Sequence, residues 1–291
     1  MIKQMKSEHL KHVIELNIAV LLVSTSGLLG RYISMPPPVT IWLRCLLAVV
    51  ILGAYIWYKK IDLKVERKKD WVTIILSGLF FGAHWITYFY ALQLSNVAIG
   101  MLSLFTYPVI TALLEPLFFK TKLNVKHVLL GVIVLIGVYF LSPEFNIENN
   151  HTKGVLFGLI SAVFYAIRNI LMKKKVANYH GSMLMFYQML IITLVLWPVL
   201  FIFEVKPTTN DWQALLVLAL VTTSIGHTLF VMSFKNFSIS TASIMSSVQP
   251  IYGIIFGFLL LNEIPSGNTL IGGFLILTTV VIESINSRKK K

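Results

Sequence analysis

Long apolar stretches alternate with short polar breaks along almost the whole chain. Ten of these stretches come close to the roughly 20 apolar residues that a helix needs to cross a bilayer. They cover residues 13–34, 39–58, 71–94, 97–119, 124–142, 153–173, 182–203, 212–234, 239–261 and 266–286. Some breaks between them are very short, as at 94–96 and 236–238, and such connections force neighbouring helices to run antiparallel. The pattern therefore predicts an all-α integral membrane protein with ten transmembrane helices.

Lysine and arginine residues gather on one side of this predicted topology. Both termini and every second connection together hold 20 of the 25, whereas the opposite connections hold only Lys153 and Lys206. Cytoplasmic segments of membrane proteins carry such an excess of positive charge, so we expect both termini to be cytoplasmic. The net charge of +13 follows from this topology. Nucleic-acid binding is not expected, because no basic domain stands apart from the helix ends.

The composition is typical of a membrane protein and excludes some kinds of cysteine chemistry. Hydrophobic residues make up 56% of the chain and charged residues 13%, whereas soluble domains are about 25% charged. The single cysteine, Cys45, excludes an intrachain disulfide and a cluster of thiolate metal ligands. The first apolar run is too long for the core of a cleaved signal peptide, so we interpret it as a retained span.

An internal repeat becomes visible when the sequence is shifted by 142 residues. Pro108 then falls on Pro250, and residues 97–110 fall on 239–252 with the same order of small residues, mid-span proline and apolar tail. Each half holds five spans, and because five is odd, the second half must enter the membrane in the opposite orientation. Inverted repeats of this kind are typical of secondary transporters, whose substrate sites lie near the bilayer midplane between the halves.

The repeat defines the expected domain organisation. In chain order we expect a cytoplasmic segment, a five-helix repeat, an external linker, a second five-helix repeat and a basic cytoplasmic tail, at residues 1–12, 13–142, 143–152, 153–286 and 287–291. Pro108 and Pro250 interrupt matching spans, because proline removes a backbone donor and clashes with the preceding turn. We expect them to act as hinges or to shape a cavity, although proline in a membrane helix can also serve packing alone.

Three stretches carry a resemblance to a known family. They are TIWLRCLLAVVIL at 40–52, LQLSNVAIGMLSLFTYPVITALL at 92–114 and FSISTASIMSSVQPIYGIIFGFLLLNEIPSGNTLIGGFLIL at 237–277. They resemble EamA-type members of the drug/metabolite transporter superfamily, and the similarity covers about residues 13–286. The resemblance implies a ten-helix carrier of the bacterial inner membrane, built from two inverted repeats, whose relatives export amino acids and related small metabolites. The family's usual Gly-Glu after the fourth span is absent at 119–121, so a role for that acid applies only to Glu263.

Three ionisable side chains inside or near the ends of predicted spans are candidates for gating. A charge in hydrocarbon costs about 2.5–3.5 kcal/mol on insertion scales and therefore needs a partner or water. Arg44 could bind a substrate carboxylate or close an outer gate, or its side chain could extend to the lipid headgroups. Arg168 could extend to the inner interface or pair with Glu115. For Glu115, an inner gate pair, a proton-coupling carboxylate and a solvated helix end all stay open.

Polar and aromatic side chains within the spans indicate a cavity. His84 and His227 occupy nearly equivalent places in the two halves and can carry protons near neutral pH, although hydrogen-bonded packing histidines are the alternative. Tyr88 shares a helix face with His84, and Tyr107 and Gln249 precede the matched prolines. A mostly apolar cavity with few hydrogen-bonding groups suits small amphipathic solutes. An interfacial aromatic belt is the competing explanation. The predicted substrate-binding residues are His84, Trp85, Tyr88, Tyr107, Tyr165, Gln188, His227 and Gln249.

The favoured function is a secondary carrier that exports a small organic metabolite, such as an amino acid, by alternating access. The sequence holds no G-x-x-x-x-G-K-[ST] loop, so direct use of ATP by this chain is not expected. A nucleotide-sugar-like or cationic-drug carrier is the alternative. A membrane enzyme or receptor is more remote, because no H-E-x-x-H site occurs and no predicted span holds an aspartate.

The expected partners follow from this function. They are a small-molecule substrate, the lipid bilayer and a coupled proton or counter-substrate. We expect no cofactor and no metal, and a chain that acts as a monomer or a weak homodimer.

Overall fold

The computed structural model describes residues 2–119, 125–142, 144–204, 206–237, 242 and 245–288. Within these ranges the regular structure is helical and no strand occurs. The helices are α1 (Ile2–Tyr32), α2 (Pro37–Lys59), α3 (Lys68–Leu94), α4 (Val97–Leu104), α5 (Tyr107–Phe119), α6 (Val125–Leu141), α7 (Asn150–Lys173), α8 (Gly181–Leu196), α9 (Val199–Ile202), α10 (Thr209–Val217), η1 (Leu218–His227), α11 (Thr228–Ser233), α13 (Gln249–Leu261) and α14 (Gly267–Arg288).

Seven helical segments in the described part of the chain are long and apolar enough to span a membrane. They are Leu10–Tyr32, Pro37–Lys59, Lys68–Leu94, Val97–Phe118, Asn150–Lys173, Gly181–Ile202 and Thr209–Ser233. Three shorter apolar helices cover Val125–Leu141, Gln249–Leu261 and Gly267–Ile282. These segments overlap the ten stretches predicted from the hydropathy pattern, so the all-helical membrane class is confirmed. The start of the ninth stretch lies largely outside the described residues.

Local sequence signals set several of the helix ends. The proline run before α2 places Pro37 at the first helical position, where a missing N–H costs no bond. The side chain of Asn96 caps α4 by accepting from the backbone N–H of Ile99 at 2.8 Å. Thr208 and Asp211 form a reciprocal capping box at the start of α10. These polar breaks let consecutive helices turn back sharply across the membrane.

The two predicted proline breaks are present at matching places. α4 ends at Leu104 and α5 begins at Tyr107, so the helix is interrupted at residues 105–106, just before Pro108. A turn at residues 247–248 precedes α13, which begins at Gln249 just before Pro250. Both prolines are buried. The two interruptions are separated by the 142 residues of the sequence repeat, so both halves carry the same discontinuity.

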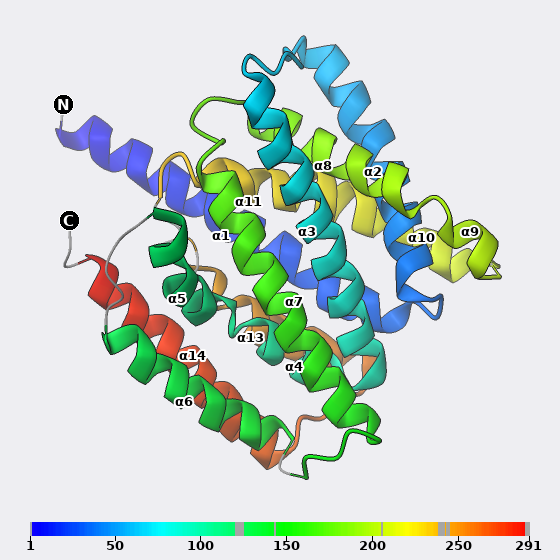
Figure 1. The fold of residues 1–291 in the computed structure, drawn as a ribbon, viewed down its shortest axis with the longest axis vertical. Coiled ribbons are helices and arrows are strands. Elements are labelled where there is room, and N and C mark those ends of the chain that lie inside the picture. The colour runs from blue at the N-terminus through cyan, green and yellow to red at the C-terminus, as the bar shows by residue number, and fades with distance from the viewer. Residues whose placement is uncertain are drawn as a thin grey trace.

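Helix packing repeats between the two halves. α3 packs along α7, and α1 packs along η1 and α11. Under the sequence repeat α1 corresponds to α7, and η1 and α11 correspond to parts of α3. In the same way α4 and α5 contact α7, while α13 contacts α1. α2 packs on α8, and α6 packs on α14. Figure 1 shows α6 and α14 side by side along one edge, with the start of α1 and the end of α14 on the same side of the molecule.

Small residues bring α7 close to the first half. A Cβ atom added to Gly158 would overlap the side chain of Ser103 on α4, and one added to Gly154 would overlap Ser95. Membrane helices use small residues in this way to approach closely. The contact places Tyr165, less than two turns further along α7, against the interrupted α4–α5 segment.

Candidate functional site

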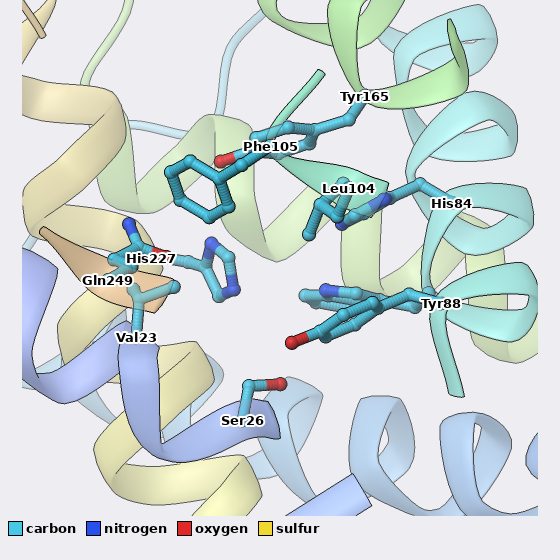
Figure 2. A pocket seen from close by; sticks show the side chains of 10 residues that line it. Val23, Ser26, His84, Tyr88, Leu104, Phe105, Tyr165, His227 and Gln249 are labelled. Atoms are coloured by element: carbon cyan, nitrogen blue, oxygen red, sulfur yellow. The ribbon is translucent and has the colours of Figure 1, made fainter. Parts of the chain in front are cut away.

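A small internal cavity lies where helices of both halves meet. Side chains from α1, α3 and α4 face side chains from α7, η1 and α13, and Figure 2 shows them pointing toward one another across this space. The cavity has a volume of about 20 Å³, which is enough for about one water molecule. Its lining residues are Val23, Ser26, His84, Trp85, Tyr88, Leu104, Phe105, Tyr165, His227 and Gln249.

Most residues of the predicted substrate-binding set meet at this cavity. His84, Trp85 and Tyr88 come from α3, and they face Tyr165, His227 and Gln249 from the second half. The two groups of residues are at least 77 positions apart in the sequence (from Tyr88 to Tyr165), so the fold rather than local structure brings them together.

Two predicted residues lie just outside the cavity lining. Tyr107 hydrogen-bonds through its hydroxyl to Ser246 at 2.7 Å. Its ring packs edge-on against Tyr165, with the ring centroids 4.8 Å apart. Gln188 accepts a hydrogen bond from Arg168 at 3.0 Å. In this conformation Tyr107 therefore supports Tyr165 of the cavity lining, whereas Gln188 binds Arg168, which does not line the cavity.

His84 is held in one orientation by Ser161. The Ser161 hydroxyl donates to the backbone carbonyl of His84 at 2.9 Å and lies 2.7 Å from His84 Nδ1. Because the serine proton is used, Nδ1 is the donor to the serine oxygen. The imidazole also stacks on Tyr165, with centroids 4.4 Å apart.

His227 has a different environment from His84. Its ring packs edge-on against Phe81 and Trp85, each at 5.3 Å between centroids. Its Nδ1 atom is buried and has no hydrogen-bond partner in the part of the chain that the structure describes. Buried polar atoms are rarely left unpaired, and those that are call for an explanation such as a missing ligand. Among the described residues, no group of three or more His, Cys, Asp or Glu side chains could hold a metal ion.

A ten-residue π-helix, η1, carries His227 at its C-terminal end. The hydroxyls of Thr223 and Ser224 donate to the carbonyls of Leu218 and Ala219, five residues earlier, at 2.7 Å each. π-helical segments are rare and often occur at functional sites. The sequence pattern did not predict this segment; the run of three hydroxyl residues at 222–224 within an apolar span is the signal that could have indicated it.

Arg44 is fully buried in the centre of the bundle. Its Nε donates to Thr223 at 2.7 Å and its Nη1 to Ser26 at 3.4 Å. Its guanidinium lies over Trp85, 3.8 Å from the ring centroid. Among the described residues, its Nη2 has no hydrogen-bond partner. The side chain therefore does not extend to the lipid headgroups, and it contacts two residues of the cavity wall, Ser26 and Trp85.

Arg168 is also fully buried, but all three of its guanidinium nitrogens have partners. Nε donates to Gln188 and Nη1 to Asn169, at 3.0 Å each, while Nη2 lies 3.3 Å from the sulfur of Met185. Its guanidinium lies 3.9 Å from the ring centroid of Phe81. Arg168 therefore does not extend to the surface of the bundle.

The pairing of Arg168 with Glu115 that the sequence left open is not among these contacts. Glu115 lies half-buried on α5, and its role in gating stays a prediction.

An ion pair ties the halves together at one end of the bundle. Arg31, in the last turn of α1, donates to Glu263 at 2.8 Å and to the backbone carbonyl of Gln93 at 2.8 Å. The second carboxylate oxygen of Glu263 accepts from the backbone N–H of Val97, at the start of α4, at 2.8 Å. One carboxylate thus links α1, α4 and the α13–α14 connection. Because the topology predicted from the sequence puts this end outside, we call Arg31, Glu263 and Val97 the outer tie.

The equivalent position in the second half is also a cation. Lys173 follows Arg31 by the repeat distance and donates to the backbone carbonyls of Phe234 and Phe237, at 2.6 and 3.0 Å. Arg31 and Lys173 thus both bind carbonyls at the end of the corresponding partner helix. Cations stabilise helix C-termini, so the two contacts serve the same purpose at the two ends of the molecule.

Comparison with known proteins agrees with this architecture. A solved crystal structure superposes with a TM-score of 0.69 at 19% identity, covering 97% of this chain and 99% of that one, which shows a shared fold. The uncharacterized transporter YxxF of Bacillus subtilis is 24% identical over 249 residues, 84% of this chain and 79% of that protein. The pseudopaline exporter CntI of Pseudomonas aeruginosa is 23% identical over 209 residues, 72% of this chain and 73% of that protein.

The chain is also similar to a second transporter with a named substrate and to a family of transporters. The S-adenosylmethionine uptake transporter of Rickettsia conorii is 26% identical over 252 residues, 84% of this chain and 80% of that protein. The sequence pattern of the EamA-like transporter family matches the chain twice, at residues 12–142 and 152–285. The two matches together cover nearly the whole sequence, and the structure is a bundle of apolar helices. This multi-pass membrane protein therefore belongs to the EamA-like transporter family.

Proposed function

We propose that this chain is a secondary carrier that exports amino acids or related small metabolites by alternating access. The observation that carries the proposal is the cavity between the halves, which is lined by aromatic and polar side chains from both. Binding sites for small amphipathic solutes combine apolar walls with a few fixed polar groups in this way. One relative is named for pseudopaline export and another for S-adenosylmethionine uptake, so both directions of flux occur among similar proteins.

The proposal includes a specific topology. The chain crosses the bacterial inner membrane ten times, as two five-helix inverted repeats at 13–142 and 153–286, with both termini in the cytoplasm. Three observations support it: the family pattern matches twice, the helix contacts recur between the halves, and the helix breaks match. The excess of lysine and arginine in alternate connections supports the orientation.

The cavity in this structure represents a closed state of the carrier. A volume of about 20 Å³ cannot hold an amino acid, because pockets for small organic ligands measure about 300–1,000 Å³. Helices must therefore move apart for the solute to enter. The interrupted segments before Pro108 and Pro250 are the proposed hinges, because they lack continuous helical hydrogen bonds next to the cavity.

Contacts at the two ends of the bundle then act as gates. The outer tie joins the halves at one end. At the other end Lys175 pairs with Asp70 at 2.6 Å, and the Tyr179 hydroxyl donates to the same carboxylate at 2.7 Å. Alternating access requires these contacts to break in turn, with the solute favouring one facing over the other through different contacts in each. Glu115 belongs to the inner end in this proposal.

Transport by purified protein tests the proposal. Liposomes holding the full chain are loaded with radiolabelled amino acids, nucleosides or dyes, and efflux is compared with that from protein-free liposomes. We expect at least one amino acid or related metabolite to leave faster. If no member of the panel does so, the proposed function is wrong.

Substitutions of cavity residues test whether the solute is transported through this cavity. His84→Ala and Gln249→Ala should each slow efflux about fivefold, the equivalent of one lost hydrogen bond of about 1 kcal/mol. Phe201→Ala is the control, because Phe201 is 78% exposed and does not line the cavity. Equal rates in all three variants would remove the assignment of transport to this cavity.

A further inference from the structure

Two buried positive charges lie beside the cavity without a compensating acid. Arg44 and Arg168 are both fully buried, and their partners in the described part of the chain are hydroxyls, amides and a thioether. Their guanidinium groups lie on Trp85 and Phe81, whose rings contact each other at 4.0 Å between centroids. Ring faces stabilise cations, but they supply no opposite charge. The closed cavity is therefore a region of positive potential.

Two unpaired donors lie next to the same aromatic residue. Among the described residues, neither Arg44 Nη2 nor His227 Nδ1 has a hydrogen-bond partner, and both atoms are buried. Both residues pack on the same indole, that of Trp85. Trp85 and His227 line the cavity, as does Ser26, which binds the neighbouring nitrogen of Arg44. Figure 2 shows His227 and Ser26 on either side of the same space. An acceptor entering here would satisfy donors that the protein leaves unpaired.

We infer, on the basis of the proposed function, that the transported solute carries a carboxylate that binds Arg44 Nη2, with His227 Nδ1 as the second donor when it carries the proton. A carboxylate fits because it accepts two hydrogen bonds and supplies the missing negative charge. Arg168 contributes its charge alone, because its nitrogens are already bonded.

The rest of the solute meets a mainly aromatic wall. Tyr88, Phe105 and Tyr165 line the cavity beside Trp85 and are almost fully buried. Their ring faces favour an apolar or aromatic body next to the carboxylate. The substrate class is thus a small monocarboxylate with an apolar or aromatic group, and a lipophilic cation without a carboxylate is disfavoured by the two arginines.

A pair of isosteric probes tests the inference without a known substrate. Indole-3-acetate and indole-3-acetamide have nearly the same shape and differ in charge. Binding of each to the purified full-length protein in detergent is measured by ligand-dependent thermal stabilisation at constant ionic strength, since a ligand that binds the folded state raises its melting temperature. We expect the acetate to bind at least about tenfold more tightly, because charge-assisted hydrogen bonds are the strong ones. L-Phenylalanine and its amide provide a second pair.

Variants show whether the preference belongs to Arg44. In Arg44→Gln the acetate should lose its advantage while the amide binds as before, and Arg44→Lys should retain part of it. Arg168→Gln is the matched control, which removes a second buried charge but no unpaired donor, and it should reduce the preference less. If Arg44→Gln does not fold, the comparison of probes on the unmodified protein still decides.

Three results would overturn the inference. They are equal binding of acid and amide in both pairs, no stabilisation by either acid, or an equal loss of preference in the Arg44 and Arg168 variants. If both acids show the preference but the transport assay shows no efflux, the carboxylate site stands and the proposed carrier function fails. If efflux occurs with no preference for the acids, the carrier stands and the inference fails.

Discussion

At the scale of single residues, Thr223 fixes the orientation of the Arg44 guanidinium. Its hydroxyl accepts from Arg44 Nε at 2.7 Å while donating to the carbonyl of Leu218 at 2.7 Å. The π-helical geometry of η1 allows the second bond, because it brings a carbonyl five residues earlier within reach. One hydroxyl thus links a buried charge on α2 to an irregular helix of the second half.

Thr223→Val should destabilise the protein by about 1–3 kcal/mol, because it leaves a buried charged donor unpaired. The measurement is thermal unfolding of the purified protein in detergent. Thr87→Val is the matched control, since the Thr87 hydroxyl bonds only to carbonyls of its own helix, those of Ala83 and His84. Equal melting temperatures in the two variants would contradict the importance of the bond to Arg44.

Several residues at or beside the cavity could be predicted from the sequence, but the hydrogen-bond partners of these residues could not. Ionisable and aromatic residues inside apolar spans stand out, which is why His84, His227 and Arg44 could be predicted. Their partners could not, because Ser161 and Thr223 are ordinary hydroxyl residues brought into contact by helix packing far along the chain. Hydropathy does not determine how deeply a side chain lies in the bundle. The sequence alone therefore allows Arg44 and Arg168 to extend to the headgroups as well as to be buried.

At the scale of helices, α4 and α5 form one segment that is interrupted between Leu104 and Tyr107. Pro108 is the second residue of α5, where a missing N–H costs no helical bond, so the proline defines the break without straining the helix. Pro116 lies inside the same helix and has no proline at the position shifted by the repeat. Pro108 therefore belongs to the internal repeat, whereas Pro116 is specific to the first half.

Pro108→Ala should slow transport without lowering thermal stability, because alanine allows α4 and α5 to join into one stiffer helix. The comparison uses efflux from proteoliposomes and melting temperatures measured on the same preparations. Pro116→Ala is the control and should retain the transport rate. Faster or unchanged efflux in Pro108→Ala would argue against a hinge at this position.

Helix positions and the matched breaks followed from hydropathy and the repeat, but η1 did not. Under the repeat η1 corresponds to part of α3, which is a regular α-helix. The difference arises from the hydroxyl run at 222–224, whose side chains bond carbonyls five residues back. The hydropathy pattern cannot distinguish a π-helix from an α-helix here, because the residues lie in an apolar span in both geometries.

At the scale of the whole molecule, the outer tie joins the two halves at one end of the bundle. Glu263 joins Arg31 to the N-terminus of α4, so it spans both halves with one carboxylate. In the proposed transport cycle, opening of that end requires both bonds to break. The tie is 20–34% exposed, so water reaches it and competes with its bonds. The sequence indicated Glu263 only through a family resemblance, and its partners became known from the structure.

Glu263→Gln should favour opening at the outer end by about tenfold, the equivalent of about 1.5 kcal/mol from a weakened charge-assisted bond. A cysteine at Leu104, which lines the cavity, reports this opening in a Cys45→Ala background. The rate of labelling by a membrane-impermeant maleimide applied to right-side-out vesicles is measured. Glu15→Gln, which removes an exposed pair with Lys11, is the control and should leave the rate unchanged.

Alternating access requires one cavity to open to the two sides of the membrane in turn, and the same cysteine tests this most directly. Labelling of Leu104→Cys is measured in right-side-out and in inside-out vesicles, with and without Glu263→Gln. Alternating access predicts reciprocal change: the substitution raises labelling from the outside and lowers it from the inside, because both facings belong to one equilibrium. Labelling that rises from both sides together, or that occurs from one side only, would contradict the claim.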